Sequence, residues 1–195
     1  MCGRIDIQGE RLSREIRELL GFNFHAPSNR DLRPTQAMQA IVSHLGQLDQ
    51  LEASWGIKPS WSKQLLINAK AETVDQKPTF KQAFRERRCI LPCSGWFEWR
   101  DEGGPKKQKY HFQHVEGSPL LMAAIWYPPA AEEGARQLVT LTTAANSECA
   151  EYHTRMPLLI RPQDLDVWLG EQAMVPLSAM IASGGDGIRV VPVKA

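Results

Sequence analysis

The sequence lacks the short motifs that mark many nucleotide-dependent and hydrolytic enzymes. It has no glycine-rich phosphate loop, no G-x-S-x-G nucleophile turn and no H-E-x-x-H zinc motif. No run approaches the roughly eighteen apolar residues of a membrane span, and the opening residues contain no apolar stretch typical of a signal peptide. We therefore expect a cytoplasmic protein that does not associate with membranes.

Net charge and cysteine content are also low, which limits the ligands to be considered. The 23 Lys and Arg residues nearly balance the 22 Asp and Glu residues, so a nucleic acid would have to bind a local basic patch. The four cysteines are expected to be reduced thiols. Cys89 and Cys93 are separated by three residues rather than two, and no second ligand pair follows, so we expect no metal site and no cofactor.

The pattern of apolar residues predicts many short strands and a few short helices. With 195 residues and a hydrophobic fraction of 43%, the chain can bury a core, and we expect one domain over residues 1–195 that acts as a monomer. No βαβ alternation is visible, which favours an α+β fold with a curled, mostly antiparallel, barrel-like sheet and short peripheral helices. Helices are expected at 13–20 with Ser13 as N-cap, at 79–87, at 146–153 with Asn146 or Ser147 as N-cap, and at 161–170.

The stretch GWFEWR at 95–100 places a carboxylate inside an aromatic strand. In a strand, Trp96 and Glu98 point to one side, and Phe97 and Trp99 point to the other. Glu98 would then be at least partly desolvated, which raises its pKa and suits it to acid–base chemistry near neutral pH. The alternative is an edge-strand glutamate paired with a nearby cation such as Arg100.

Other polar residues at strand ends have both a functional and a structural interpretation. His153 and Arg155 would face the same side of an extended segment, where they suit proton transfer and phosphate binding; the alternative is a solvated loop. Asn68 offers a neutral donor and acceptor beside the cation Lys70, although it would also serve as a helix N-cap. Thr142 could bind a phosphate or simply satisfy edge backbone groups.

Cys2 is unusual because of its position directly after the initiator methionine. If Met1 is removed, Cys2 carries a free α-amine and a thiol on the same residue. No internal cysteine provides this 1,2-aminothiol. With Met1 attached, the amine is part of a peptide bond and this reactivity is absent.

Seven short stretches, in order along nearly the whole chain, resemble one protein family. They are MCGR at the start, RPTQ at 33–36, WGIKPSW at 55–61, NAKAET at 68–73, RRCILPCSGWFEW at 87–99, LTTAAN at 141–146 and HTRMP at 153–157. Together they are similar to the SRAP (SOS-response-associated peptidase) family. Members of this family form covalent crosslinks to abasic sites in single-stranded DNA, and they are described as removing their own initiator methionine.

The resemblance implies roles for ten residues. It assigns the crosslink to Cys2, the active-site polar groups to Asn68, Glu98 and His153, the phosphate contacts to Arg4, Lys70, Thr142 and Arg155, and the DNA-facing loops to Pro34 and Trp61. The family usually has arginine where this chain has Lys70, which keeps the charge but loses the two-pronged hydrogen-bonding geometry. A weak strand-cleaving lyase activity is an expected side reaction, and the protein would be associated with the nucleoid while bound to DNA.

Two other functions remain open at this point. One is a cysteine peptidase that cleaves other proteins, with Cys2 as the nucleophile and His153 as the base. The other is a non-catalytic module that binds single-stranded DNA, for which Cys2, Glu98 and His153 would all be dispensable.

Overall fold

The computed structural model describes residues 3–129, 134–170, 175–183 and 185–194. The strands among these residues are β1 (Ile5–Ile7), β2 (Asn29–Leu32), β3 (Ala37–His44), β4 (Gln47–Trp55), β5 (Asn68–Lys70), β6 (Arg88–Cys93), β7 (Gly95–Arg100), β8 (Gln108–His114), β9 (Leu120–Tyr127), β10 (Gln137–Ala144), β11 (Arg155–Pro157) and β12 (Ile188–Pro192). The α-helices are α1 (Gly9–Leu20), α2 (Pro78–Glu86), α3 (Ser147–Ala150), α4 (Leu165–Leu169) and α5 (Leu177–Ser183), with 3₁₀ turns η1 (Ala71–Thr73) and η2 (Pro162–Asp164).

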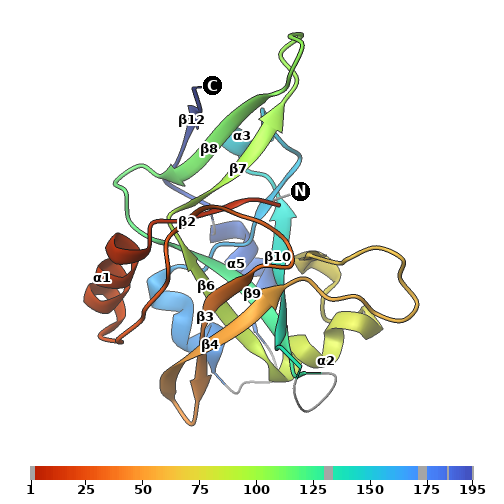
Figure 1. Cartoon of the computed structure of the whole chain (residues 1–195). Helices are drawn as coiled ribbons and strands as arrows, with labels where there is room; N and C mark the ends of the chain where they lie inside the picture. The colour runs from red at the N-terminus through yellow and green to blue at the C-terminus, as the bar shows by residue number, and fades with distance from the viewer. Residues whose placement is uncertain (1–2, 130–133, 171–174, 184, 195) are drawn as a thin grey trace.

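The strands form two sheets. The smaller sheet has the order β12-β8-β7-β1-β2, and the larger one has the order β11-β10-β4-β3-β6-β9 with β5 beside β10. Because β9 also pairs with β10, the larger sheet curls back on itself. Pairing is antiparallel except where β10 meets β4 and β5. In Figure 1, β7, β8 and β12 stand above the larger sheet, with α1 on its left and α2 at its lower right. The predicted α+β class with a curled, mostly antiparallel sheet is confirmed.

The core is centred on β6 and β9, which are adjacent in the larger sheet. Every residue of β6 is buried, and so are the first six residues of β9, as expected for strands that are covered on both faces. Trp168 of α4 is completely buried and its indole N–H donates to the Cys89 carbonyl at 2.9 Å. This contact holds the C-terminal segment against β6.

Helix α1 begins four residues earlier than predicted. Ser13 lies inside the helix, where its hydroxyl donates to the Gly9 carbonyl at 2.7 Å and accepts the Ala26 N–H at 3.1 Å. The predicted N-cap at Ser13 is therefore wrong. The Gly9 N–H instead donates to the Ser28 hydroxyl at 2.9 Å. The hydrogen-bond acceptor for the first N–H group of the helix is thus nineteen residues away in the sequence, so the local pattern could not reveal where the helix begins.

The other predicted helices lie close to their expected places. The helix predicted at 79–87 is α2, one residue earlier at each end. The Asn146 side chain accepts the Cys149 N–H at 2.9 Å, which confirms one of the two expected N-caps for α3. The region 161–170 contains η2 and α4. Asn68 begins β5 and caps no helix, so the N-cap alternative for this residue is wrong.

Gly95 allows β7 and β8 to approach each other beside the aromatic strand. A Cβ atom at this position would lie 2.4 Å from the Phe112 carbonyl oxygen and 2.4 Å from His111 Nε2. Because the Phe112 oxygen belongs to the backbone of a paired strand, it cannot move away without disturbing the β7–β8 ladder. Only glycine fits here.

We therefore expect Gly95→Ala to lower the free energy of unfolding by about 1–3 kcal/mol through overpacking. Urea unfolding followed by tryptophan fluorescence measures this change. Gly104→Ala is the matched control, because a Cβ atom there meets its nearest neighbour, the Lys106 carbonyl, at an ordinary 3.8 Å. Equal unfolding midpoints for the two variants would contradict the prediction.

Candidate functional site

Glu98 lies in the middle of β7 and is only 5% exposed. The side chains alternate as predicted: Trp96 stacks on Phe112, while Phe97 stacks on His111 on the other face. Burial raises the pKa of Glu98 to about 7, against an opposing contribution from the positive N-terminus of the chain. The predicted desolvation is thus confirmed, and the Glu98 carboxyl group can take up or release a proton near neutral pH.

His153 lies between α3 and β11, on the same side of β7 and β8 as Glu98. Its neighbour Tyr152 packs against Tyr110, with ring centroids 4.5 Å apart, and Tyr110 is the cross-strand partner of Glu98. His153 Nδ1 lies 2.9 Å from the Arg155 backbone nitrogen and 3.0 Å from the Arg155 carbonyl oxygen, so it accepts the N–H in one tautomer and donates to the carbonyl in the other. Burial lowers the pKa of His153 below its usual value. The ring is therefore mostly neutral at physiological pH.

The beginning of the chain runs alongside β7. Ile5 pairs with Trp96, and the Phe97 N–H donates to the Arg4 carbonyl at 3.0 Å, which extends the pairing one residue before β1. In an antiparallel ladder the next residue, Gly3, comes opposite Glu98. Cys2, the predicted crosslinking residue, lies outside the described residues.

Asn68 is positioned by a parallel pairing of β5 with β10. It lies opposite Thr140, whose hydroxyl donates to the Asn68 side-chain oxygen at 2.5 Å. Thr140 is 2% exposed, so this bond orients the amide from a buried anchor. Lys70, at the other end of β5, is exposed.

Arg155 is held by the carboxylate of Glu72, a partner that the local sequence does not indicate. Its two terminal nitrogens each lie 2.8 Å from one oxygen of Glu72, a two-pronged pair that lowers the pKa of Glu72 to about 2. Arg155 also donates to the Thr142 carbonyl at 2.5 Å. Thr142 itself is 1% exposed, with its hydroxyl 3.4 Å from the Ala69 carbonyl. No local signal could link Glu72 to a residue 83 positions away.

Arg4 is also paired with a carboxylate. Its guanidinium donates to both oxygens of Asp31 at 2.8 and 2.7 Å and lies 5.7 Å from the Trp99 ring centroid. Of the two residues predicted for DNA-facing loops, Pro34 is half-buried, whereas Trp61 is 67% exposed. Trp61 borders a hollow of about 480 Å³ that Tyr127 also lines.

The internal thiols are poor nucleophiles. Burial raises the pKa of the Cys149 thiol to about 12 and raises those of Cys89 and Cys93 further. Among the described residues, no three His, Cys, Asp or Glu side chains are grouped so as to hold a metal ion. Within the same residues, no helix has both the length and the apolar character needed to cross a membrane.

Comparison with known proteins establishes the family. A family model described as SOS response associated peptidase (SRAP) matches residues 1–195. The chain belongs to the SRAP family. The resemblance stated from its motifs is confirmed.

The relatives of this SRAP chain carry consistent names. Abasic site processing protein YedK from Escherichia coli (strain K12) is 35% identical over 134 residues, which are 67% of this chain and 60% of YedK. Abasic site processing protein YoqW from Bacillus subtilis (strain 168) is 26% identical over 190 residues, which are 90% of this chain and 83% of YoqW. The match to YedK thus spans less than two thirds of that protein.

Solved structures share the SRAP fold of this chain. The crystal structure of a phage-related protein from Bordetella bronchiseptica has a TM-score of 0.81 and 23% identity, covering 100% of this chain and 95% of that one. A second Bordetella bronchiseptica protein has a TM-score of 0.79 and 22% identity, with full coverage of both chains.

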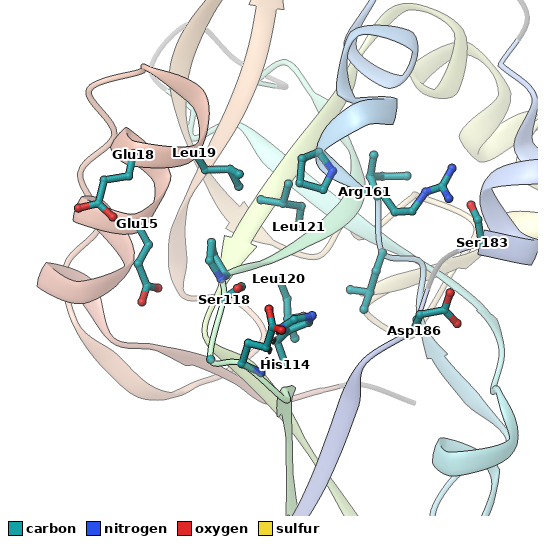
Figure 2. Close-up of a pocket in the computed structure, with 17 residues that line it drawn as sticks. Glu15, Glu18, Leu19, His114, Ser118, Leu120, Leu121, Arg161, Ser183 and Asp186 are labelled. Atoms are coloured by element: carbon teal, nitrogen blue, oxygen red, sulfur yellow. Dashed lines mark hydrogen bonds between the residues drawn. The ribbon is translucent and has the colours of Figure 1, made fainter.

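A cavity of about 650 Å³ lies elsewhere on this SRAP chain. Figure 2 shows Leu120 and Leu121 in it, with Glu15 and Glu18 of α1 on one side and Asp186 on the other. None of the described residues that line it is a predicted site residue. The cavity is therefore separate from the Glu98 and His153 site.

The raised pKa of Glu98 has a consequence for stability. The ordinary pKa of a glutamate is 4.5, and in the folded protein it is about 7, so the folded state binds the proton more tightly. The contribution of protonated Glu98 to the stability of the fold is fully present below pH 4.5, declines as the pH rises from 4.5 to 7, and is lost above 7. A neutral side chain of the same shape does not ionise, so it keeps its contribution to stability at high pH.

We expect Glu98→Gln to be more stable than the parent protein by about 1–3 kcal/mol at pH 8, and the difference to vanish near pH 4.5. Chemical denaturation at a series of pH values gives this profile. Exposed Glu52→Gln is the control and should show no pH-dependent gain. A constant difference between the Glu98 variant and the parent at all pH values would refute the assignment.

Proposed function

We propose that this protein processes abasic sites in single-stranded DNA by forming a covalent thiazolidine between Cys2 and the sugar aldehyde. The observation that carries the proposal is the pairing of the chain's first described residues with β7, beside buried Glu98. Membership of the SRAP family and the names of the relatives support it. Removal of Met1 by the protein itself is part of the proposal, because only then does Cys2 have a free amine.

The chemistry uses both groups of Cys2. An α-amine has a pKa of about 7.7–8.0, so a fraction is neutral at physiological pH and attacks the aldehyde carbon. Loss of one water gives a Schiff base. The thiol then adds to the imine carbon: the carbon–sulfur bond forms, the thiol proton passes to the nitrogen, and a five-membered ring closes. Because amine and thiol belong to one residue, ring closure benefits from a high effective concentration.

Three side chains serve this reaction. Glu98, with a pKa of about 7, accepts a proton from the α-amine and returns one to the departing water. His153, in its imidazolium form, protonates the ring oxygen of the sugar when the aldehyde opens, and its lowered pKa makes that form a stronger acid. Asn68, oriented by Thr140, holds the amine or the sugar by hydrogen bonds. The same Schiff base permits β-elimination, which would give a weak lyase activity.

DNA binding would use a small number of cations and exposed rings. Arg4, Lys70 and Arg155 offer positive charge to phosphates, with Thr142 beneath Arg155. Exposed Trp61, with Pro34 in a neighbouring loop, offers a surface on which an unpaired base can stack. A single strand can bend to present its sugar, whereas a duplex buries it. In this proposal residues 1–195 act as one domain, as a monomer, in the cytoplasm.

We expect Cys2→Ala to abolish the heat-stable adduct with a single-stranded oligonucleotide that carries one abasic site. The variant retains an α-amine but no thiol, so only a labile Schiff base can form. The adduct is measured on a denaturing gel after heating, with protein whose first residue is verified by intact mass. Cys149→Ala is the control, since that thiol is buried and should be dispensable.

The adduct assay, together with peptide-cleavage and DNA-binding assays, separates the alternatives. An equal heat-stable adduct in Cys2→Ala would refute the crosslink. Cleavage of a peptide substrate in trans, unaffected by an N-terminal tag that blocks crosslinking, would favour the peptidase. Tight single-strand binding with no adduct in the parent protein would favour a non-catalytic module.

We expect Glu98→Gln to slow adduct formation by roughly 100-fold, the usual range for loss of a positioned acid–base group. In the parent protein, ionisation of Glu98 makes the rate rise as the pH passes through about 7. The variant should lose this rise and follow only the titration of the amine. Rates measured from mildly acidic to mildly alkaline pH test this. Parallel profiles for the two proteins would show that Glu98 is not the group that titrates.

A further inference from the structure

Three cations surround one carboxylate on the smaller sheet. Asp31 of β2 accepts hydrogen bonds from Arg4 at 2.7 and 2.8 Å and from Arg33 at 2.7 and 3.0 Å. Lys109 Nζ of β8 lies 3.5 Å from the Asp31 Oδ1 atom. We call these four residues the Asp31 cluster. It combines segments that are up to 105 residues apart in the sequence, Arg4 and Lys109 being the most distant.

The Asp31 cluster lies on the face of the sheet opposite Glu98. The Lys109 ammonium sits 3.8 Å from the centroid of the Phe97 ring, and Phe97 points away from Glu98 because adjacent strand residues alternate. Arg4 and Lys109 also lie within 5.7 and 5.5 Å of the Trp99 ring centroid. The cluster thus combines cations with aromatic rings, the composition that suits a single-stranded nucleic acid.

One carboxylate serves three cations in this cluster, and part of the cluster is accessible. Three positive side chains face the single negative side chain of Asp31. The Arg33 side chain is 58% exposed and the Asp31 side chain 35% exposed. Burial alone would raise the pKa of Asp31, but the hydrogen bonds from Arg33 and Arg4 outweigh it and lower the pKa to about 2. Asp31 therefore stays ionised at physiological pH.

We propose that Arg4, Arg33 and Lys109 form a subsite for one backbone phosphate of single-stranded DNA, and that Asp31 occupies it as an internal anion. A carboxylate and a phosphodiester each carry one negative charge and accept the same guanidinium N–H groups. A DNA phosphate must replace Asp31 as their acceptor, so Asp31 weakens binding to undamaged DNA. This inference rests on the proposed function: weak reversible binding releases intact DNA, while a covalent adduct retains the damaged strand.

We expect Asp31→Asn to bind an undamaged, fluorescently labelled single-stranded oligonucleotide about 3–10-fold more tightly at low salt, as measured by anisotropy. The dependence of log K on log salt concentration should become steeper by about 0.7, the value for one additional phosphate contact on a single strand. Arg33→Gln and Lys109→Gln should each weaken binding and reduce the slope by a similar amount.

Two matched variants control for net charge. Asp49→Asn repeats the charge change of Asp31→Asn at an exposed position of β4, and Arg14→Gln repeats that of Arg33→Gln at an exposed position of α1. Both should leave affinity and salt slope nearly unchanged. Unchanged or weaker binding by Asp31→Asn would overturn the proposal, as would an equal gain in Asp49→Asn. If Asp31→Asn does not fold, unchanged binding by both Arg33→Gln and Lys109→Gln overturns it.

Failure of this inference can be told apart from failure of the proposed function. A parent protein that makes the Cys2-dependent adduct, with no effect of Asp31→Asn on affinity, refutes only the subsite. A parent protein that makes no such adduct refutes the proposed chemistry, whatever the affinities of the variants.

Discussion

The pairing of β1 with β7 is the constraint on which the rest of the site depends. Backbone hydrogen bonds hold the chain's first described residues beside the strand that carries Glu98, and Gly95 lets β8 approach closely on the other side. The result is a carboxylate that is 5% exposed and lies beside the first described residues of the chain. In the proposed reaction, an α-amine gains reactivity from a nearby proton acceptor only if the two are held together.

Carboxylates hold two of the proposed phosphate-binding cations in place. Arg155 forms an ion pair with Glu72, and Arg4 forms one with Asp31. Both carboxyl groups have a pKa of about 2, so they remain charged at physiological pH. Such pairs restrict long side chains and reduce the entropy lost when a ligand binds. They also compete with that ligand for the same donors. Under the proposed function, the balance of these two effects, rather than the net charge of +1, governs how strongly a DNA phosphate is held.

Several elements could be predicted from local pattern alone. The alternation of side chains through GWFEWR is a property of any extended strand, and it placed Glu98 on the opposite face from Phe97. The cap at Asn146 depends on a neighbour three residues away, so it too was visible. The start of α1 was missed because Ser28 satisfies it from a distant loop. Asn68 resembled a helix cap, but parallel pairing with β10 made it the start of a strand.

The sequence by itself determined which reactive groups are available: a thiol directly after the initiator methionine, a glutamate in an aromatic strand, and the motifs of the SRAP family. Only the tertiary structure decided how those groups behave. The pKa of Glu98 depends on how completely β7, β8 and the Tyr152 segment exclude water, and the partners of Arg4 and Arg155 lie 27 and 83 residues away. Burial and ion pairing arise from contacts between segments that are distant in the sequence, so local sequence patterns cannot predict them.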